Sequence, residues 1–179
     1  MDGVTYRLLI NAADRADNNL SIILSDSVTY DITPPDFLDI APDAGSYVNS
    51  AVLEFTNPEA LSTASVKWER IDGEEDKGSP HIIDVPDEYY AIGPQETSSI
   101  ITPNLVNGSI YRLTLSGKDL AGNLAGVVYH NMHFDIEPPV LEILYPTTRP
   151  EVNNTDVGYN LSEQLGSCLL YTSPSPRDS

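Results

Sequence analysis

The three histidines are the side chains of this sequence best suited to metal binding or proton transfer. His130 and His133 are three residues apart, which is a metal-ligand spacing on an α-helix. The residues around them alternate as in a β-strand, where an offset of three places two side chains on opposite faces. We therefore predict solvated histidines without a shared metal. His81 follows Ser79-Pro80, and we expect it to close this loop through a hydrogen bond.

Other catalytic patterns are missing from the sequence. There is no Ser/His/Asp order of a hydrolase, no glycine-rich phosphate loop and no metal-protease motif. Glu74, Glu75 and Asp76 lie between two glycines and are expected to form a solvated hairpin tip. The single cysteine, Cys168, lies in the C-terminal tail, so the rest of the chain has no disulfide and no cysteine nucleophile. The sequence thus predicts a protein that is not an enzyme and has no cofactor, with calcium as the one ion to consider.

Carboxylates beside two Pro-Pro pairs are the candidates for calcium binding. Calcium takes six to eight oxygen ligands, mostly carboxylate and carbonyl. Asp135 and Glu137 precede Pro138-Pro139, and Asp31 precedes the earlier pair. Asp119 lies a strand's length from Asp135, about 40 Å at ~3.3 Å per residue, so these two cannot share an ion within one domain. The alternative is that Asp135 simply ends its strand and Asp119 caps its own turn by accepting backbone amide hydrogens, and we favour it.

The charge of the chain is strongly negative, with 27 acidic and 9 basic residues among 179 and a net charge of −18. Such a surface repels phosphate backbones and anionic lipids, which argues against nucleic-acid binding and membrane association. No apolar stretch reaches the ~20 residues that a membrane-spanning helix needs. Hydrophobic residues make up 40% of the chain, which is enough for a packed core. The composition therefore fits a soluble, self-repelling extracellular protein.

An internal repeat organises most of the chain. Residues 3–35 read GVTYRLLINAADRADNNLSIILSDSVTYDITPP, and residues 108–139 read GSIYRLTLSGKDLAGNLAGVVYHNMHFDIEPP. Tyr6 aligns with Tyr111, and the two Pro-Pro pairs align after one deletion. The similarity continues beyond the prolines with a period of 104–105 residues. This period is the size of one β-sandwich domain.

Each Pro-Pro pair marks a predicted domain boundary, because proline cannot donate to a β-ladder and stiffens the connection. The chain then holds the last strands of one domain (1–33), one complete domain (34–137) and the first strands of the next (138–167). Seven short strands and no helical period predict an all-β, immunoglobulin-like Greek-key sandwich for the complete domain. We expect these strands at 36–40, 48–56, 63–71, 81–85, 97–102, 109–117 and 124–136.

Four residues of the later repeat carry structural signals of such a sandwich. Tyr111 resembles the residue of the tyrosine corner, in which a tyrosine hydroxyl bonds to backbone a few positions upstream. Asp119, Gly122 and Asn123 form the predicted hairpin turn, with Gly122 free to take a positive φ. In the earlier repeat Asp17 takes the place of Gly122, and aspartate tolerates this left-handed geometry.

Three aromatic residues could either fill a core or stack on a sugar. Trp68 lies in VKWER with Val66 on the same face, as does the core tryptophan of a sandwich's third strand. We therefore predict a core residue. Tyr89-Tyr90 could stack on carbohydrate, but strands and their rims are rich in tyrosine in any case.

These motifs resemble bacterial immunoglobulin-like repeats and their fibronectin type III-like relatives. YRLTLSGKDLAGN followed by FDIEPP is similar to the Tyr-x-Leu, Asp-x-Ala-Gly-Asn and Asp-x-x-Pro-Pro pattern that closes such repeats. The resemblance covers 1–35 and 105–146 well and 57–104 loosely. It implies a non-catalytic spacer that contacts neighbouring repeats of an extracellular or cell-surface protein. Two alternatives stay open: an adhesin module for glycan or protein, and an accessory repeat of a large secreted enzyme.

The C-terminal tail has a different origin in our interpretation. Residues 168–179, CLLYTSPSPRDS, resemble the translated sequence of a sequencing-library adapter. Such a tail is set aside in reasoning about the fold. Met1 runs directly into a strand-like segment without a signal peptide. We therefore expect the natural protein, with its signal peptide and anchor, to extend beyond both ends of this sequence.

Overall fold

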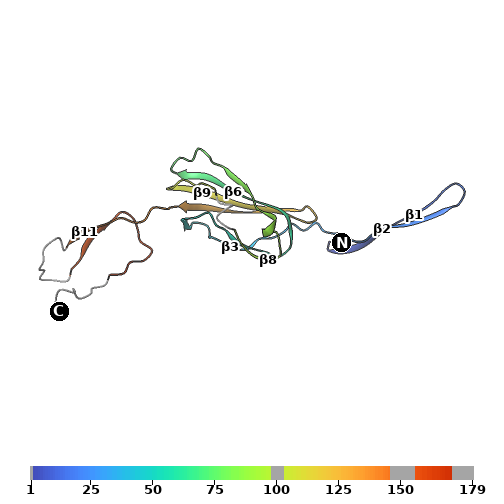
Figure 1. The fold of residues 1–179 in the computed structure, drawn as a ribbon, viewed down its shortest axis with the longest axis horizontal. Helices are drawn as coiled ribbons and strands as arrows, with labels where there is room; N and C mark the ends of the chain where they lie inside the picture. Colours follow the sequence, from blue (N-terminus) through green and yellow to red (C-terminus); the bar gives the residue numbers. More distant parts are fainter. Residues whose placement is uncertain (1, 98–102, 146–155, 171–179) are drawn as a thin grey trace. The chain divides into compact units, whose positions relative to one another are not determined.

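The computed structural model describes residues 2–97, 103–145 and 156–170. The chain divides into two compact units, Met1–Ile136 and Glu137–Ser179. In the described residues every regular element is a β-strand except one 3₁₀ turn, η1 (Asp87–Tyr89) (Figure 1). The prediction of an all-β protein is therefore confirmed. No helix in this part of the chain is long and apolar enough to span a membrane.

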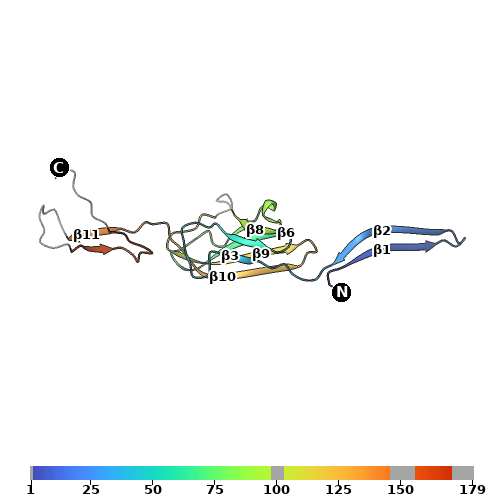
Figure 2. The ribbon, with the colours of Figure 1, turned by 90° about the horizontal axis from the view of Figure 1, so that it is seen from below.

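The first two strands form a long antiparallel hairpin, β1 (Val4–Ala13) with β2 (Asn19–Tyr30) (Figure 2). Its turn is closed by Asp14, whose Oδ1 accepts the backbone N–H groups of Ala16 at 2.8 Å and Asn18 at 2.9 Å. Asp17 takes φ 62°, the left-handed conformation that the sequence predicts at this position. Large apolar side chains of both strands are roughly half exposed.

Residues 36–136 form two sheets. The five-stranded sheet has the order β4-β10-β9-β6-β7, and all its pairs are antiparallel except β4 with β10. Its strands are β4 (Tyr47–Val48), β6 (Leu61–Gly73), β7 (His81–Asp84), β9 (Ser109–Asp119) and β10 (Leu124–Phe134). The three-stranded antiparallel sheet has the order β3-β5-β8. Its strands are β3 (Leu38–Ala41), β5 (Glu54–Asn57) and β8 (Gly93–Glu96).

The predicted strand at 48–56 is wrong as a single element. Val48 ends β4 and pairs with Phe134 of the five-stranded sheet, whereas Phe55 belongs to β5 of the three-stranded sheet. The chain crosses from one sheet to the other between these positions, and one continuous ladder cannot serve both. The predicted strand 97–102 lies outside the described residues apart from Thr97, and β8 precedes it at Gly93–Glu96.

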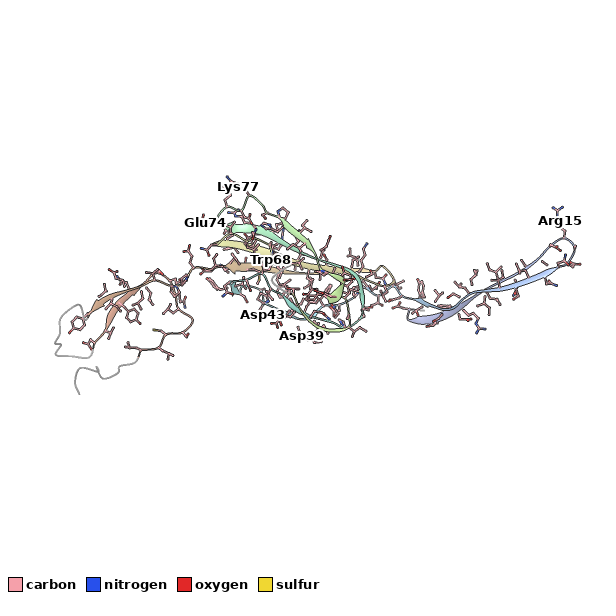
Figure 3. All side chains as sticks on the ribbon, in the orientation of Figure 1. Arg15, Asp39, Asp43, Trp68, Glu74 and Lys77 are labelled. Carbon is pink, nitrogen blue, oxygen red and sulfur yellow. The ribbon has the colours of Figure 1, made fainter. Side chains whose placement is uncertain are left out.

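Both sheets contribute to one hydrophobic core. Trp68 and Tyr111 are fully buried at its centre, with ring centroids 6.1 Å apart in an edge-to-face contact. Alternation along β9 buries every second residue, because successive strand side chains point to opposite faces. Figure 3 shows Trp68 in the interior, with Glu74 and Lys77 at the rim. The buried apolar residues are Phe37, Ile40, Ala51, Leu53, Phe55, Leu61, Ala64, Val66, Trp68, Val85, Tyr111, Leu113, Leu115, Met132 and Phe134.

The second unit contains one described strand pair, β11 (Leu141–Tyr145) with β12 (Gly158–Leu161). The pair is antiparallel, with Glu142 opposite Asn160 and Tyr145 opposite Gly158. Residues 146–155, between the two strands, lie outside the described part of the chain, and so do residues 171–179 of the tail.

Candidate functional site

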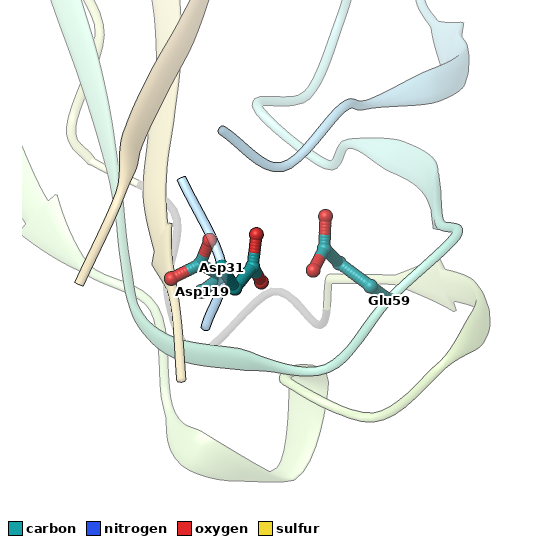
Figure 4. Close-up of side chains that lie close together, drawn as sticks. All are labelled: Asp31, Glu59 and Asp119. Carbon is teal, nitrogen blue, oxygen red and sulfur yellow. The ribbon is translucent and has the colours of Figure 1, made fainter. Parts of the chain in front are cut away.

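Three carboxylates from distant parts of the chain meet at one end of the two sheets. Asp31 follows β2, Glu59 lies in the turn between β5 and β6, and Asp119 ends β9. One carboxylate oxygen from each lies within 4.8 Å of the other two (Figure 4). Among the described residues this is the one group of three or more potential metal ligands. We call these three residues the carboxylate cluster.

Asp119 is held in the cluster by its own hairpin turn. Its side chain is 1% exposed, and it accepts the backbone N–H of Asn123 at 2.9 Å and the Asn123 amide at 2.8 Å. Burial by itself raises the pKa of Asp119, but these hydrogen bonds outweigh burial and hold the pKa below its usual value. Gly122 takes φ 94° in the same turn. The turn that the sequence predicts from Asp119, Gly122 and Asn123 is present.

Asn123 also places Asp31. The Asn123 side-chain amide donates to the backbone oxygen of Asp31 at 3.1 Å and to that of Thr33 at 3.4 Å. One asparagine therefore joins the β9–β10 turn to the segment before Pro34. This contact explains why Asp31 lies near Asp119 although 88 positions separate them in the sequence.

Glu59 has a raised pKa for three reasons. Partial burial is the largest cause, and the charges of Asp119 and Asp31 add to it. A shared proton or a cation would relieve this repulsion. The cluster supplies three carboxylates, whereas calcium takes six to eight oxygens, so an ion would need further ligands. Of the calcium candidates from the sequence, Asp31 belongs to the cluster and Asp135 and Glu137 do not.

We expect the Glu59→Gln substitution to stabilise the folded chain at pH 7. A carboxyl whose folded pKa lies above its unfolded value of about 4.5 favours folding below that value. This contribution is lost as the pH rises through the folded pKa. The advantage of Glu59→Gln should therefore be present at pH 7 and vanish below pH 4.5, as measured by urea unfolding at both pH values. Glu75→Gln, at an exposed loop position, is the control, and equal stability of wild type and Glu59→Gln at pH 7 would contradict the expectation.

A second polar group lies at the loop between β6 and β7. Asp76 Oδ2 is 2.7 Å from His81 Nε2 and accepts the Tyr111 hydroxyl hydrogen at 2.7 Å. Its Oδ1 accepts the backbone N–H of Gly78 at 2.9 Å. The predicted loop-closing hydrogen bond of His81 is therefore present. The prediction of a wholly solvated hairpin tip is wrong for Asp76, whose side chain is 4% exposed.

The tyrosine corner that the sequence predicts is also present. The backbone N–H of Val106 donates to the Tyr111 hydroxyl oxygen at 2.9 Å, five positions upstream. The hydroxyl thus accepts from backbone and donates to Asp76. Sequence reasoning found the first contact through the position of Tyr111 and missed the second, because nothing local to residue 76 indicates a partner in β9.

The other residues singled out in the sequence do not join either polar group. His130 is exposed, and His133 stacks on Tyr47 with ring centroids 4.6 Å apart and an interplanar angle of 16°. Neither histidine belongs to a group of metal ligands in the described residues. Tyr90 donates its hydroxyl hydrogen to the Val85 carbonyl at 2.7 Å and packs with Tyr89 against the core. Tyr6, the counterpart of Tyr111 in the sequence, is 44% exposed.

Comparison with known proteins adds no further assignment, because no family model, curated protein or solved structure matches this chain significantly.

Proposed function

We propose that the chain is a stretch of tandem immunoglobulin-like β-sandwich repeats that space other domains of an extracellular or cell-surface protein. The observation that carries the proposal is the pairing of two sheets, β4-β10-β9-β6-β7 and β3-β5-β8, around one core. An immunoglobulin-like sandwich likewise packs two sheets over one core and buries a tryptophan against it. Trp68 on β6 is fully buried in the shared core, which supports the proposal.

Two structural similarities between distant segments support the proposed repeat. In the β1–β2 turn, Asp14 bonds the Asn18 backbone N–H at 2.9 Å and the Asn18 amide at 2.7 Å, and Asp119 makes the same two contacts with Asn123. The same backbone bond, 3.1 Å from aspartate N–H to asparagine carbonyl, closes both turns.

The second similarity is in the register of the β3–β5 and β11–β12 ladders. Leu38 pairs with Thr56 and Ala41 with Glu54, whereas Glu142 pairs with Asn160 and Tyr145 with Gly158. Each residue of the later ladder stands 104 positions after its counterpart, which is the period of the repeat. Equal register is what two copies of one sandwich edge would show.

The placement of aromatic residues favours a spacer over an adhesin module. Carbohydrate-binding surfaces present exposed aromatic rings, but Trp68 is fully buried and Tyr89 and Tyr90 pack against the core. In the described part of residues 34–137, Tyr47 is the one Phe, Trp or Tyr side chain that is mostly exposed, at 76%. Saturable glycan binding that is lost in Tyr47→Ala would favour the adhesin alternative. A complete open reading frame with a catalytic domain would favour the accessory-repeat alternative.

The proposal predicts that residues 34–137 fold alone. A chain of these residues contains the whole core and should melt in one cooperative transition with coincident near-UV and far-UV signals. Residues 1–33 and 138–167 should show no cooperative transition alone, because two strands cannot bury a core. Calorimetry and circular dichroism of the three pieces measure this, and a molten 34–137 chain would overturn the domain boundaries.

A further inference from the structure

The loop between β6 and β7, residues 74–80, has no apolar side chain except that of Pro80. It therefore cannot be held by hydrophobic burial, and its position depends on polar contacts. Its two ends are fastened separately from its middle. Ser109 Oγ donates to the Glu74 carbonyl at 2.8 Å, and the Arg70 backbone N–H donates to Ser79 Oγ at 2.7 Å.

The middle of the loop is fastened by one side chain, Asp76. Its carboxylate forms hydrogen bonds with three groups: the Tyr111 hydroxyl of β9, the His81 ring of β7, and the Gly78 backbone N–H in the loop. Tyr111 is itself fully buried and anchored by Val106. Asp76 thus joins a polar, exposed loop to the rigid centre of the domain.

We propose that His81, Asp76 and Tyr111 form a pH-sensitive latch, which fastens the 74–80 loop to β9 and opens it when Asp76 loses its negative charge. The sheets stay folded on opening, because the Tyr111 ring remains in the core and the loop covers none of the core with apolar side chains. Local opening of this kind costs less than global unfolding, so it can be populated while the domain remains native.

The charges around Asp76 support this behaviour. Burial raises the pKa of Asp76, but the hydrogen bonds from His81, Tyr111 and Gly78 outweigh burial and hold the pKa below its usual value of 3.8. The stabilisation from the latch is therefore present above pH 3.8 and lost as the pH falls through the folded pKa. Burial raises the pKa of Tyr111, which keeps its hydroxyl a donor.

The other charged groups near the loop act on its ends or face solvent. Arg70 of β6 directs its guanidinium to the carbonyls of Gly73 and Glu74, which leaves the loop middle to Asp76. Glu74, Glu75 and Lys77 are exposed. His81 of β7 faces the carboxylate directly, with its Nε2 2.7 Å from Asp76 Oδ2.

The test compares Asp76→Asn with Glu75→Gln in the full chain by amide hydrogen exchange at pH 7. Asparagine imitates the protonated carboxyl in charge and size, and the neighbouring exposed Glu75 controls for loss of one charge in the same loop. We expect protection of the Gly78 and Ser79 amides to fall about tenfold or more in Asp76→Asn. Protection should be unchanged in Glu75→Gln, and unchanged in β6 and β9 of both variants.

Two outcomes would overturn the latch. Unchanged protection of Gly78 and Ser79 in Asp76→Asn would show that the carboxylate does not hold the loop. An equal loss of protection in β6, β9 and the loop would show that Asp76 stabilises the whole domain and does not act on the loop alone. Should Asp76→Asn fail to fold, NMR titration of the wild type from pH 7 to pH 2 decides: the Gly78 and Ser79 amides should share the inflection of the Asp76 carboxyl while β9 amides keep native shifts. Separate inflections, or simultaneous loss of the β9 signals, would refute the proposal.

Discussion

Trp68→Ala is expected to lower the free energy of unfolding by about 3–5 kcal/mol, the loss seen when a large aromatic side chain leaves a cavity in a core. Trp68 is fully buried, and its ring packs edge to face on Tyr111. Within the described residues its indole Nε1 has no hydrogen-bond partner, so the loss comes from packing and no hydrogen bond is given up. Denaturant unfolding of the full chain, followed by circular dichroism, measures the change.

Tyr47→Ala is the matched control for Trp68→Ala. Tyr47 also belongs to the five-stranded sheet and stacks on another ring, but it is 76% exposed. Surface substitutions of this kind usually change stability by at most about 0.5 kcal/mol. A small effect of Trp68→Ala, similar to that of Tyr47→Ala, would mean that the two sheets do not share the core described above.

Tyr111→Phe is expected to cost about 2–3 kcal/mol, although it removes only one oxygen atom. The hydroxyl donates to the carboxylate of Asp76 and accepts from the partly buried Val106 N–H, and deletion leaves both partners one hydrogen bond short. The ring stays in place, so the packing against Trp68 is preserved. The measurement is the urea midpoint and slope of the two proteins at pH 7, with an unchanged slope indicating an unchanged folded state.

Tyr6→Phe is the control for Tyr111→Phe, because the repeat aligns these two tyrosines. Tyr6 is 44% exposed in the β1–β2 hairpin, so the same chemical change there should alter stability by less than about 0.5 kcal/mol. Equal effects at the two positions would show that the corner hydroxyl contributes nothing beyond a surface tyrosine. The pair therefore compares the buried corner hydroxyl with a partly exposed one.

The pH dependence of the chain should combine two opposite carboxyl effects. Asp76 holds the 74–80 loop in place above pH 3.8, because its pKa is held down by hydrogen-bond donors, whereas Glu59 opposes folding at neutral pH, because its pKa is raised. At pH 7, Glu59→Gln should consequently raise the free energy of unfolding, whereas Asp76→Asn should lower the protection of the 74–80 loop amides and leave the sheets unchanged. The contrast arises from surroundings alone, since Asp76 is met by hydrogen-bond donors, whereas Glu59 is partly buried and lies beside like charges.

Local patterns in the sequence determined the all-β class, the buried Trp68, the tyrosine corner and the Asp119–Asn123 turn. These features depend on neighbours within a few positions. A strand's alternation places Trp68 on the inner face, and a turn needs only its own aspartate and glycine. The spacing of the similar segments 3–35 and 108–139 is likewise a property of the sequence alone, and it led to the proposed boundaries at the Pro-Pro pairs.

Tertiary structure alone decided which distant groups meet. Glu59 joins Asp31 and Asp119 because the β5–β6 turn and the β9–β10 turn lie at the same end of the sheets, and Asp76 reaches Tyr111 across 35 positions. The strand at 48–56 divides because the chain changes sheets there. Residue patterns indicate which face of an element is buried. The electrostatic environment of a side chain and the partners of a strand depend on where other elements lie, and their positions are set only when the whole core packs.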